Sequence, residues 1–168
     1  QVPLMSPSPL PCPEMRQIPK EMEIEDIQSY VESYAESARN MREAGLDGVE
    51  LFAAQGYLLS EFLSPHVNKR TDIYGGSLEN RMRFMMEALT AIRKQVNYDF
   101  IVGVRLNADD FVPGGVTIDI AIQTALLLAQ SGMVDYLNIS GMTYLSWPGW
   151  ISDMTSPKGM FTHLSHEI

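Results

Sequence analysis

The sequence contains a single cysteine, Cys12, so it cannot form an internal disulfide or a metal site built from several thiolates. It has no apolar run near the ~20 residues that a membrane-spanning helix needs, and no basic stretch followed by an apolar one at its start. Basic residues are scarce and scattered: 12 Lys and Arg stand against 21 Asp and Glu, for a net charge of −9. Nucleic acid and anionic membranes bind concentrated positive charge. We therefore expect a cytoplasmic globular protein that binds neither nucleic acid nor a membrane.

Two further kinds of site are missing from the sequence. The three histidines, His66, His163 and His166, have no carboxylate or cysteine at the spacing of metal ligands, so we predict no metal site. No glycine-rich phosphate-binding fingerprint follows any strand-like segment. The missing fingerprint weakens the case for a dinucleotide-binding sheet.

Amphipathic helical segments alternate with short apolar segments along the 168 residues. Helices are predicted at residues 24–41, 78–96 and 118–130, where apolar residues recur every three or four positions. Strands are predicted at residues 48–52, 100–106 and 134–140. Gly45 and Gly132 are expected to end two of the helices, and Ser77 and Thr117 to cap the start of two. Apolar strands that alternate with helices predict parallel βαβ units.

Such units form either a doubly wound sheet or a (β/α)8 barrel. Polar side chains stand at the carboxyl end of each predicted strand, namely Gln55 and Tyr57, Arg105 and Asn107, and Asn138 and Ser140. Barrel enzymes build their active sites at that end, which favours the barrel, although a full barrel takes about 250 residues. We divide the chain into a proline-rich loop (1–20), the βα units (21–140), and a loop with the start of a further helix (141–168).

The segment from Gly45 to Phe84 resembles the old yellow enzyme family of flavin-dependent oxidoreductases. The family run G-Y-L-L-x-x-F-L-S-P stands at residues 56–65, and the run N-K-R-x-D-x-Y-G-G-S-x-x-N-R follows at residues 68–81. Shorter similarities extend the resemblance over nearly the whole chain; they are Pro19-Lys20-Glu21-Met22, VGVRLN around Arg105, and YLNISGMTY around Ser140.

The resemblance implies an FMN-linked (β/α)8 barrel that oxidises NAD(P)H, of which this chain is the central part. The three predicted strands would be the fourth, fifth and sixth of the barrel. Family loops that hold the flavin phosphate lie outside the chain, and so would the cysteines of any 4Fe-4S cluster in the full-length parent. A partial barrel leaves open sheet edges, which would pair with the missing barrel parts or with a second copy of the chain.

The resemblance assigns roles to Tyr57 and Arg105. In the ene-reductase members, the tyrosine at the position of Tyr57 protonates the substrate α-carbon after the flavin delivers hydride to the β-carbon. The alternative is a tyrosine whose hydroxyl is merely satisfied at the barrel rim. The arginine at the position of Arg105 lies against the flavin and stabilises negative charge near N1 and O2, as a permanently charged guanidinium can. Its alternative role is a structural ion pair with Asp109, Asp110 or Glu50.

The predicted substrate pocket departs from the family pattern. Most members carry two donors that grip a substrate carbonyl, where this chain has Phe52 and Gln55; Phe52 cannot donate, and Gln55 keeps one amide donor. The trimethylamine dehydrogenase-like branch also has an aromatic residue at the first position and oxidises amines. Tyr144, Trp147 and Trp150 follow the last predicted strand and could line an aromatic bowl for an alkylammonium group. Packing is the alternative role for these tryptophans.

We therefore expect an FMN-dependent oxidoreductase that passes hydride from NAD(P)H to an activated C=C bond of a small molecule. Tyr57 would be the proton donor, Arg105 would bind the cofactor, and Phe52, Gln55, Tyr57 and Trp147 would line the substrate pocket. An amine dehydrogenase or demethylase is the second hypothesis. A truncated, non-catalytic fragment is the third.

Overall fold

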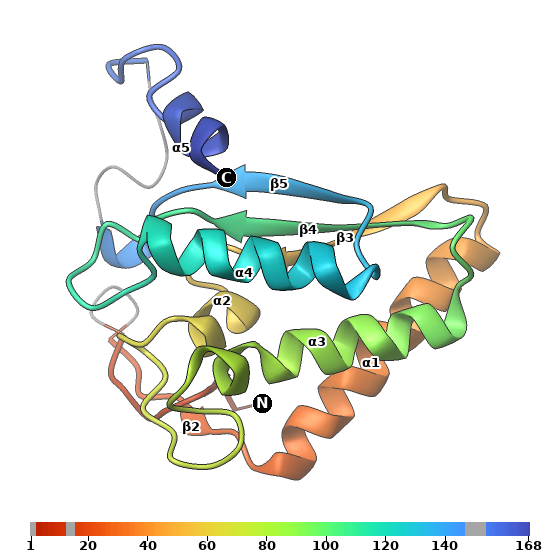
Figure 1. The fold of residues 1–168 in the computed structure, drawn as a ribbon. Helices are drawn as coiled ribbons and strands as arrows, with labels where there is room; N and C mark the ends of the chain where they lie inside the picture. Colours follow the sequence, from red (N-terminus) through yellow and green to blue (C-terminus); the bar gives the residue numbers. More distant parts are fainter. Residues whose placement is uncertain (1–2, 13–15, 147–153) are drawn as a thin grey trace.

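The computed structural model describes residues 3–12, 16–146 and 154–168 (Figure 1). Its elements, in chain order, are β1 (Met5–Ser6), β2 (Lys20–Glu21), α1 (Ile24–Glu43), β3 (Gly48–Ala53), α2 (Leu58–Leu63), α3 (Leu78–Gln95), β4 (Ile101–Asn107), α4 (Ile118–Ser131), β5 (Tyr136–Ser140), a 3-10 turn (Tyr144–Ser146) and α5 (Thr162–Glu167). The predicted helices and strands are thus present within one or two residues of their expected bounds. Among the described residues, no helix is both long and apolar enough to cross a bilayer.

Three parallel strands form the central sheet in the order β3-β4-β5. Phe52 pairs with Arg105 across the first two strands, and Arg105 pairs with Asn138 across the next two. Helices α3 and α4 make the two crossovers, so the βαβ units predicted from the alternation are confirmed. Helices α1, α3 and α4 gather on one side of this sheet (Figure 1).

The helix ends follow local sequence signals. The Ser77 hydroxyl accepts a hydrogen bond from the Asn80 N–H at 3.3 Å at the start of α3. Gly45 and Gly132 follow α1 and α4 with φ of 85° and 65°, a left-handed conformation that glycine adopts without steric cost. Thr117 precedes α4 as expected, but its side chain makes no capping hydrogen bond. Thr117 therefore occupies the N-cap position of α4 without a side-chain hydrogen bond to the helix.

The core lies between the sheet and the helices. Alternate residues of β4, Val102, Val104 and Leu106, are fully buried toward the helices, where Leu89 of α3 is also fully buried. Because side chains alternate along a strand, the residues between them face the opposite side of the sheet. That opposite face carries the polar residues of the site.

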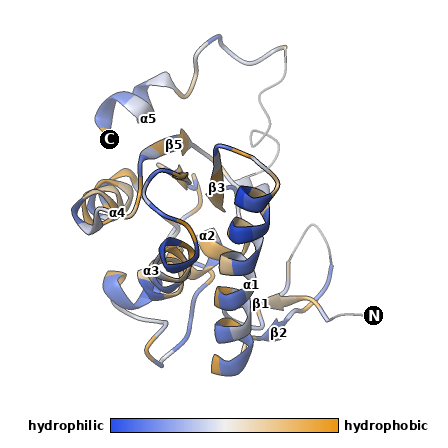
Figure 2. Ribbon diagram, turned by 90° about the vertical axis from the view of Figure 1, so that its right-hand side faces the viewer, coloured by the Kyte–Doolittle hydropathy of each residue, from blue (hydrophilic) through white to orange (hydrophobic). Residues whose placement is uncertain are grey.

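The short helix α2 is an element that periodicity did not predict. Its six residues, LLSEFL, are too few to show a helical repeat, and Leu59, Phe62 and Leu63 are each 1% exposed. Figure 2 shows α2 as a hydrophobic segment in the middle of the molecule. Its burial fixes the turn that precedes it, from Gln55 to Tyr57.

In its described residues, the proline-rich N-terminal segment is not merely a surface loop. Strand β1 pairs in parallel with β2. Ser8 is 2% exposed, and its hydroxyl accepts a hydrogen bond from the Lys69 N–H at 2.9 Å. Arg70 forms a two-point ion pair with Asp72 and donates to the carbonyl of Met22 at 2.6 Å. The motif 68–81 thus has a structural role, because it ties the N-terminal segment to the βα units.

Candidate active site

The face of the sheet away from the helices is polar and partly open. The strand register pairs Glu50 of β3 with Gly103 of β4, and Phe52 with Arg105. On the other side of β4, Gly103 pairs with Tyr136 of β5, and Arg105 pairs with Asn138. A Cβ on Gly103 would lie 2.2 Å from the ring of Tyr136, so the absence of a side chain there makes room for the tyrosine. In a parallel barrel this face is the interior, and its carboxyl end is where active sites form.

Glu50 is the centre of a hydrogen-bond network on this face. Its carboxylate accepts from the Arg105 Nε at 2.8 Å, from the Asn138 amide at 3.0 Å and from the Tyr136 hydroxyl at 3.1 Å. Partial burial favours the neutral acid, but the hydrogen bonds from Asn138 and Tyr136 and the Arg105 charge outweigh it and hold the pKa of Glu50 below its ordinary value. Of the three ion-pair partners considered for Arg105 from the sequence, Glu50 is the one found.

Arg105, Phe52 and Tyr57 form a continuous stack toward the carboxyl end of the sheet. The Arg105 guanidinium carbon lies 5.1 Å from the centre of the Phe52 ring, which suits a cation–π contact. The Phe52 and Tyr57 rings meet edge to face with centres 5.0 Å apart. Tyr57 remains 55% exposed and precedes the first turn of α2. The three predicted site residues are thus brought together.

A hollow of about 510 Å³ opens beside this stack. It is lined by Tyr30 and Tyr34 of α1 and by Phe52, Tyr57 and Leu58. The lining is almost entirely aromatic, and the two tyrosines of α1 were not predicted as part of the site. Their spacing of four places them on one helix face, but which face meets Phe52 depends on how α1 lies against β3.

Gln55 lies at the turn but points its polar groups inward. Its backbone N–H donates to the Asn107 side-chain oxygen at 3.1 Å, and its own amide nitrogen donates to the Ser140 hydroxyl at 3.3 Å. Asn107 in turn donates to Asp110 at 2.8 Å. The polar residues predicted at the three strand ends therefore meet, as expected for parallel strands. One of the two N–H groups of the Gln55 side-chain amide is engaged within the protein, so at most one remains for a substrate carbonyl.

Behind the turn lies a partly buried pair that the sequence did not single out. The Tyr144 hydroxyl donates to the Glu61 carboxylate at 2.8 Å, and the Tyr144 ring covers Gly56, whose missing Cβ would lie 2.4 Å from that ring. Burial raises the pKa of Glu61 to about 7, although the hydrogen bond from Tyr144 works against it. Tyr144, considered from the sequence as part of an aromatic bowl, instead supports the turn that presents Tyr57. Glu61 occupies an unspecified position of the family motif, so the motif gave no signal for it.

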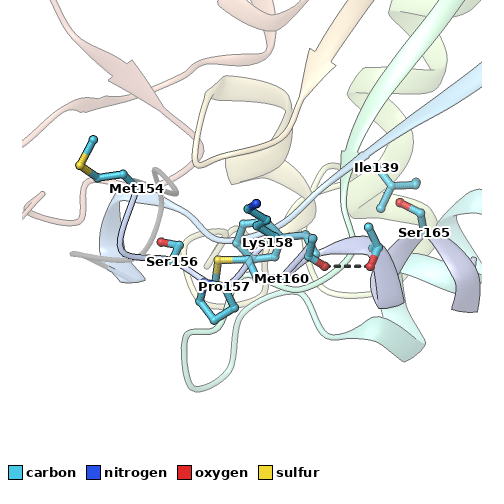
Figure 3. A pocket seen from close by; sticks show the side chains of 10 residues that line it. Ile139, Met154, Ser156, Pro157, Lys158, Met160 and Ser165 are labelled. Carbon is cyan, nitrogen blue, oxygen red and sulfur yellow. Dashed lines mark hydrogen bonds between the residues drawn. The ribbon is translucent and has the colours of Figure 1, made fainter.

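The remaining predicted positions are placed as follows. Trp147 and Trp150 lie outside the described residues. A separate hollow of about 610 Å³ adjoins β5 and the segment 154–165, with Ile139, Lys158 and Ser165 in its lining (Figure 3). Phe52 and Arg105 do not line it. Within residues 3–12, 16–146 and 154–168, no group of three or more His, Cys, Asp or Glu side chains is arranged to hold a metal ion.

Comparison with known proteins gives consistent matches. The family model described as NADH:flavin oxidoreductase / NADH oxidase matches residues 5–150. The N,N-dimethylglycine/sarcosine dehydrogenase of Chromohalobacter salexigens is 41% identical over 96% of this chain and 24% of its own length. The structure of a 2-naphthoyl-CoA reductase in complex with 2-naphthoyl-CoA superposes with a TM-score of 0.90, at 36% identity, over 98% of this chain and 25% of that one.

A more distant structure shows the fold alone. The old yellow enzyme homologue from Zymomonas mobilis superposes with a TM-score of 0.75 at 23% identity, covering 85% of this chain and 45% of that one. The predicted partial (β/α)8 barrel is confirmed, with β3, β4 and β5 as its three strands. The chain spans about a quarter of the length of the dehydrogenase and the reductase that it matches. With the family model covering residues 5–150, the chain belongs to the NADH:flavin oxidoreductase / NADH oxidase family.

Proposed function

We propose that this chain supplies one wall of the active site of an FMN-dependent oxidoreductase, which transfers hydride from NAD(P)H to an activated C=C bond of a small molecule. The observation that carries the proposal is the stack of Arg105, Phe52 and Tyr57. Through the Phe52 ring, it connects the Arg105 cation on the inner face of the sheet with the exposed Tyr57 phenol at the carboxyl end of the strands. The edge strands β3 and β5 would pair with further strands of the barrel.

The residues on this face fit a flavin. Among the described residues, Arg105 uses only its Nε in a hydrogen bond, so both terminal nitrogens remain available to an acceptor on the open face. Two parallel donors with a permanent charge suit the N1 and O2 edge of an isoalloxazine ring. When bound, FMN accepts hydride from NAD(P)H and passes it to the substrate. Arg105 would stabilise the negative charge that the ring gains.

Tyr57 would supply the proton that completes the reduction of the C=C bond. Hydride would add to the β-carbon of the substrate, and the phenol O–H would donate its proton to the α-carbon. Water would then return a proton to the Tyr57 phenolate. The turn that holds Tyr57 is specified closely, because Gln55 and Gly56 both have positive φ, 57° and 81°, and Tyr144 covers Gly56. A fixed donor of this kind contributes about 10²- to 10⁴-fold to such a step.

The pocket would activate a substrate carbonyl less strongly than most relatives do. Phe52 has no donor, and one of the two N–H groups of the Gln55 amide is bonded to Ser140. Alkenes that are already strongly electron-poor would therefore be the better substrates.

A second candidate function is the oxidation of an N-methyl amine. It is favoured by Phe52 and by the aromatic lining of the adjacent hollow, because ring faces attract alkylammonium cations. The similarity to a protein named N,N-dimethylglycine/sarcosine dehydrogenase supports the same class of substrate. In this reaction hydride leaves the N-methyl carbon for the flavin, and the resulting iminium ion is hydrolysed.

Anaerobic rapid mixing of the complete protein loaded with FMN separates these functions. An ene-reductase loses its reduced-flavin spectrum on mixing with an enone or enoate, whereas an amine dehydrogenase gains that spectrum on mixing with dimethylglycine or sarcosine. Tyr57→Phe should slow the alkene step by about 10²-fold or more and leave reduction by NAD(P)H unchanged. Tyr98→Phe is the matched control, since Tyr98 is 69% exposed and packs against Arg93 away from the site. A complete protein that takes up no FMN would contradict both functions.

A further inference from the structure

The strongest unassigned feature of the inner face is the network around Glu50. One carboxylate collects three donors from two neighbouring strands, and its side chain is 21% exposed. The arginine it holds is the residue proposed to face the flavin. A negative charge fixed 2.8 Å from that guanidinium affects both where the guanidinium lies and how much positive charge a bound ring feels.

We propose that Glu50 is a positioning residue that sets the reduction potential of the bound flavin through Arg105. The inference rests on the proposed function, because it requires FMN at this face. Glu50 holds Arg105 through Nε, and among the described residues the two terminal nitrogens make no hydrogen bond. At the same time its charge offsets part of the charge of Arg105, so the reduced, more negative flavin is stabilised less than by an unpaired arginine.

The network shows why Glu50 keeps this charge. The donors Tyr136 and Asn138 each occupy part of the carboxylate, and both come from β5, beyond the strand that carries Arg105. A carboxylate held by three donors stays ionised and cannot rotate away from the arginine. Phe52 closes the other side of the guanidinium, with 5.1 Å from its ring centre to the guanidinium carbon. The position of Arg105 is therefore determined before any ligand enters.

The test is the flavin reduction potential, measured by anaerobic equilibration of the FMN-loaded complete protein with reference dyes. Glu50→Gln keeps the size of the side chain and an oxygen acceptor but removes the charge. A charge about 10 Å from the flavin in a partly buried site would change the equilibrium between oxidised and reduced flavin on the order of tenfold. We expect the ratio of reduced to oxidised flavin to rise about tenfold, which is about 30 mV for a two-electron couple.

Two further variants distinguish charge acting through Arg105 from a general loss of structure. Tyr136→Phe removes one donor to Glu50 and leaves the carboxylate charge. The ratio of reduced to oxidised flavin in this variant should therefore stay within about twofold of the wild-type ratio. The effect of Glu50→Gln should be clearly smaller when Arg105 is already replaced by Gln, measured at saturating FMN, because the part of the effect that acts through the position of Arg105 is then lost.

The outcomes separate this inference from the proposed function. A protein that binds FMN and is reduced by NAD(P)H, but whose potential is the same in wild type and Glu50→Gln, overturns the role of Glu50 alone. An equal shift in Tyr136→Phe, a shift toward the oxidised form, or a shift of undiminished size in the Arg105→Gln background also overturns it. A protein that takes up no FMN overturns both.

Discussion

Glu61 gives the pair behind the Tyr57 turn a measurable pH dependence. Burial raises its pKa to about 7 from an ordinary value of 4.5. Between these two values the folded protein holds a proton that the unfolded chain releases. The contribution of the protonated Glu61 to the free energy of unfolding is therefore fully present below the unfolded pKa near 4.5, and it is lost as the pH rises through about 7.

The magnitude follows from the size of this shift. Each unit corresponds to 1.36 kcal/mol, so the full difference of about 2.5 units amounts to about 3 kcal/mol, of which about 2.5 kcal/mol falls between pH 5 and pH 8. Replacing Glu61 with Gln keeps an acceptor for the Tyr144 hydroxyl but removes the titration. The free energy of unfolding should therefore fall from pH 5 to pH 8 by about 2.5 kcal/mol more in the wild type than in Glu61→Gln.

Urea unfolding of both proteins at pH 5, 6, 7 and 8 makes the comparison. The difference between the two proteins is what counts, because burial also raises the pKa of Asp110, and that residue titrates in both. Identical pH slopes in wild type and Glu61→Gln would show that the carboxyl is ionised throughout, and would refute the partly buried pair in which Glu61 holds a proton.

Two further changes test the packing of the sheet and a helix start. Ser77→Ala removes the hydroxyl that accepts from the Asn80 N–H, and should lower the free energy of unfolding by about 1 kcal/mol in urea titration, with Ser77→Asn recovering most of it. Gly103→Ala places a methyl group where the Tyr136 ring lies, so it should displace that ring, break its hydrogen bond to Glu50 and cost about 1 kcal/mol; thermal unfolding that matches the wild type would contradict the close approach.

Much of the scaffold follows from local sequence. The periodic apolar residues of α1, α3 and α4 and the apolar runs of β3, β4 and β5 identify these elements, because each repeats its pattern over enough residues to be recognised. The convergence of Gln55, Asn107 and Ser140 also follows, since parallel strands end at one edge of the sheet. The short helix α2 does not follow, because six largely apolar residues carry no readable period.

The site is less predictable than the scaffold because it depends on partners distant in the sequence. Glu50 was one of three partners considered for Arg105, and only the strand register places it there, 55 residues away. The pair of Glu61 and Tyr144 joins residues 83 apart, and the burial that raises the Glu61 pKa comes from how those segments fold together. The predicted roles of Tyr57 and Arg105 came from the family resemblance, whereas their contact through Phe52 emerged from the structure.

The measurement that tests the central claim most directly is the crystal structure of the complete protein with FMN. The account predicts the flavin ring on the polar face of β3, β4 and β5, with a terminal nitrogen of Arg105 within about 3.2 Å of N1 or O2. Glu50 should still hold Nε of that arginine, and the Tyr57 hydroxyl should point into the space above the ring. A flavin bound elsewhere, or an Arg105 turned away from it, would contradict the assignment of this face as the flavin site.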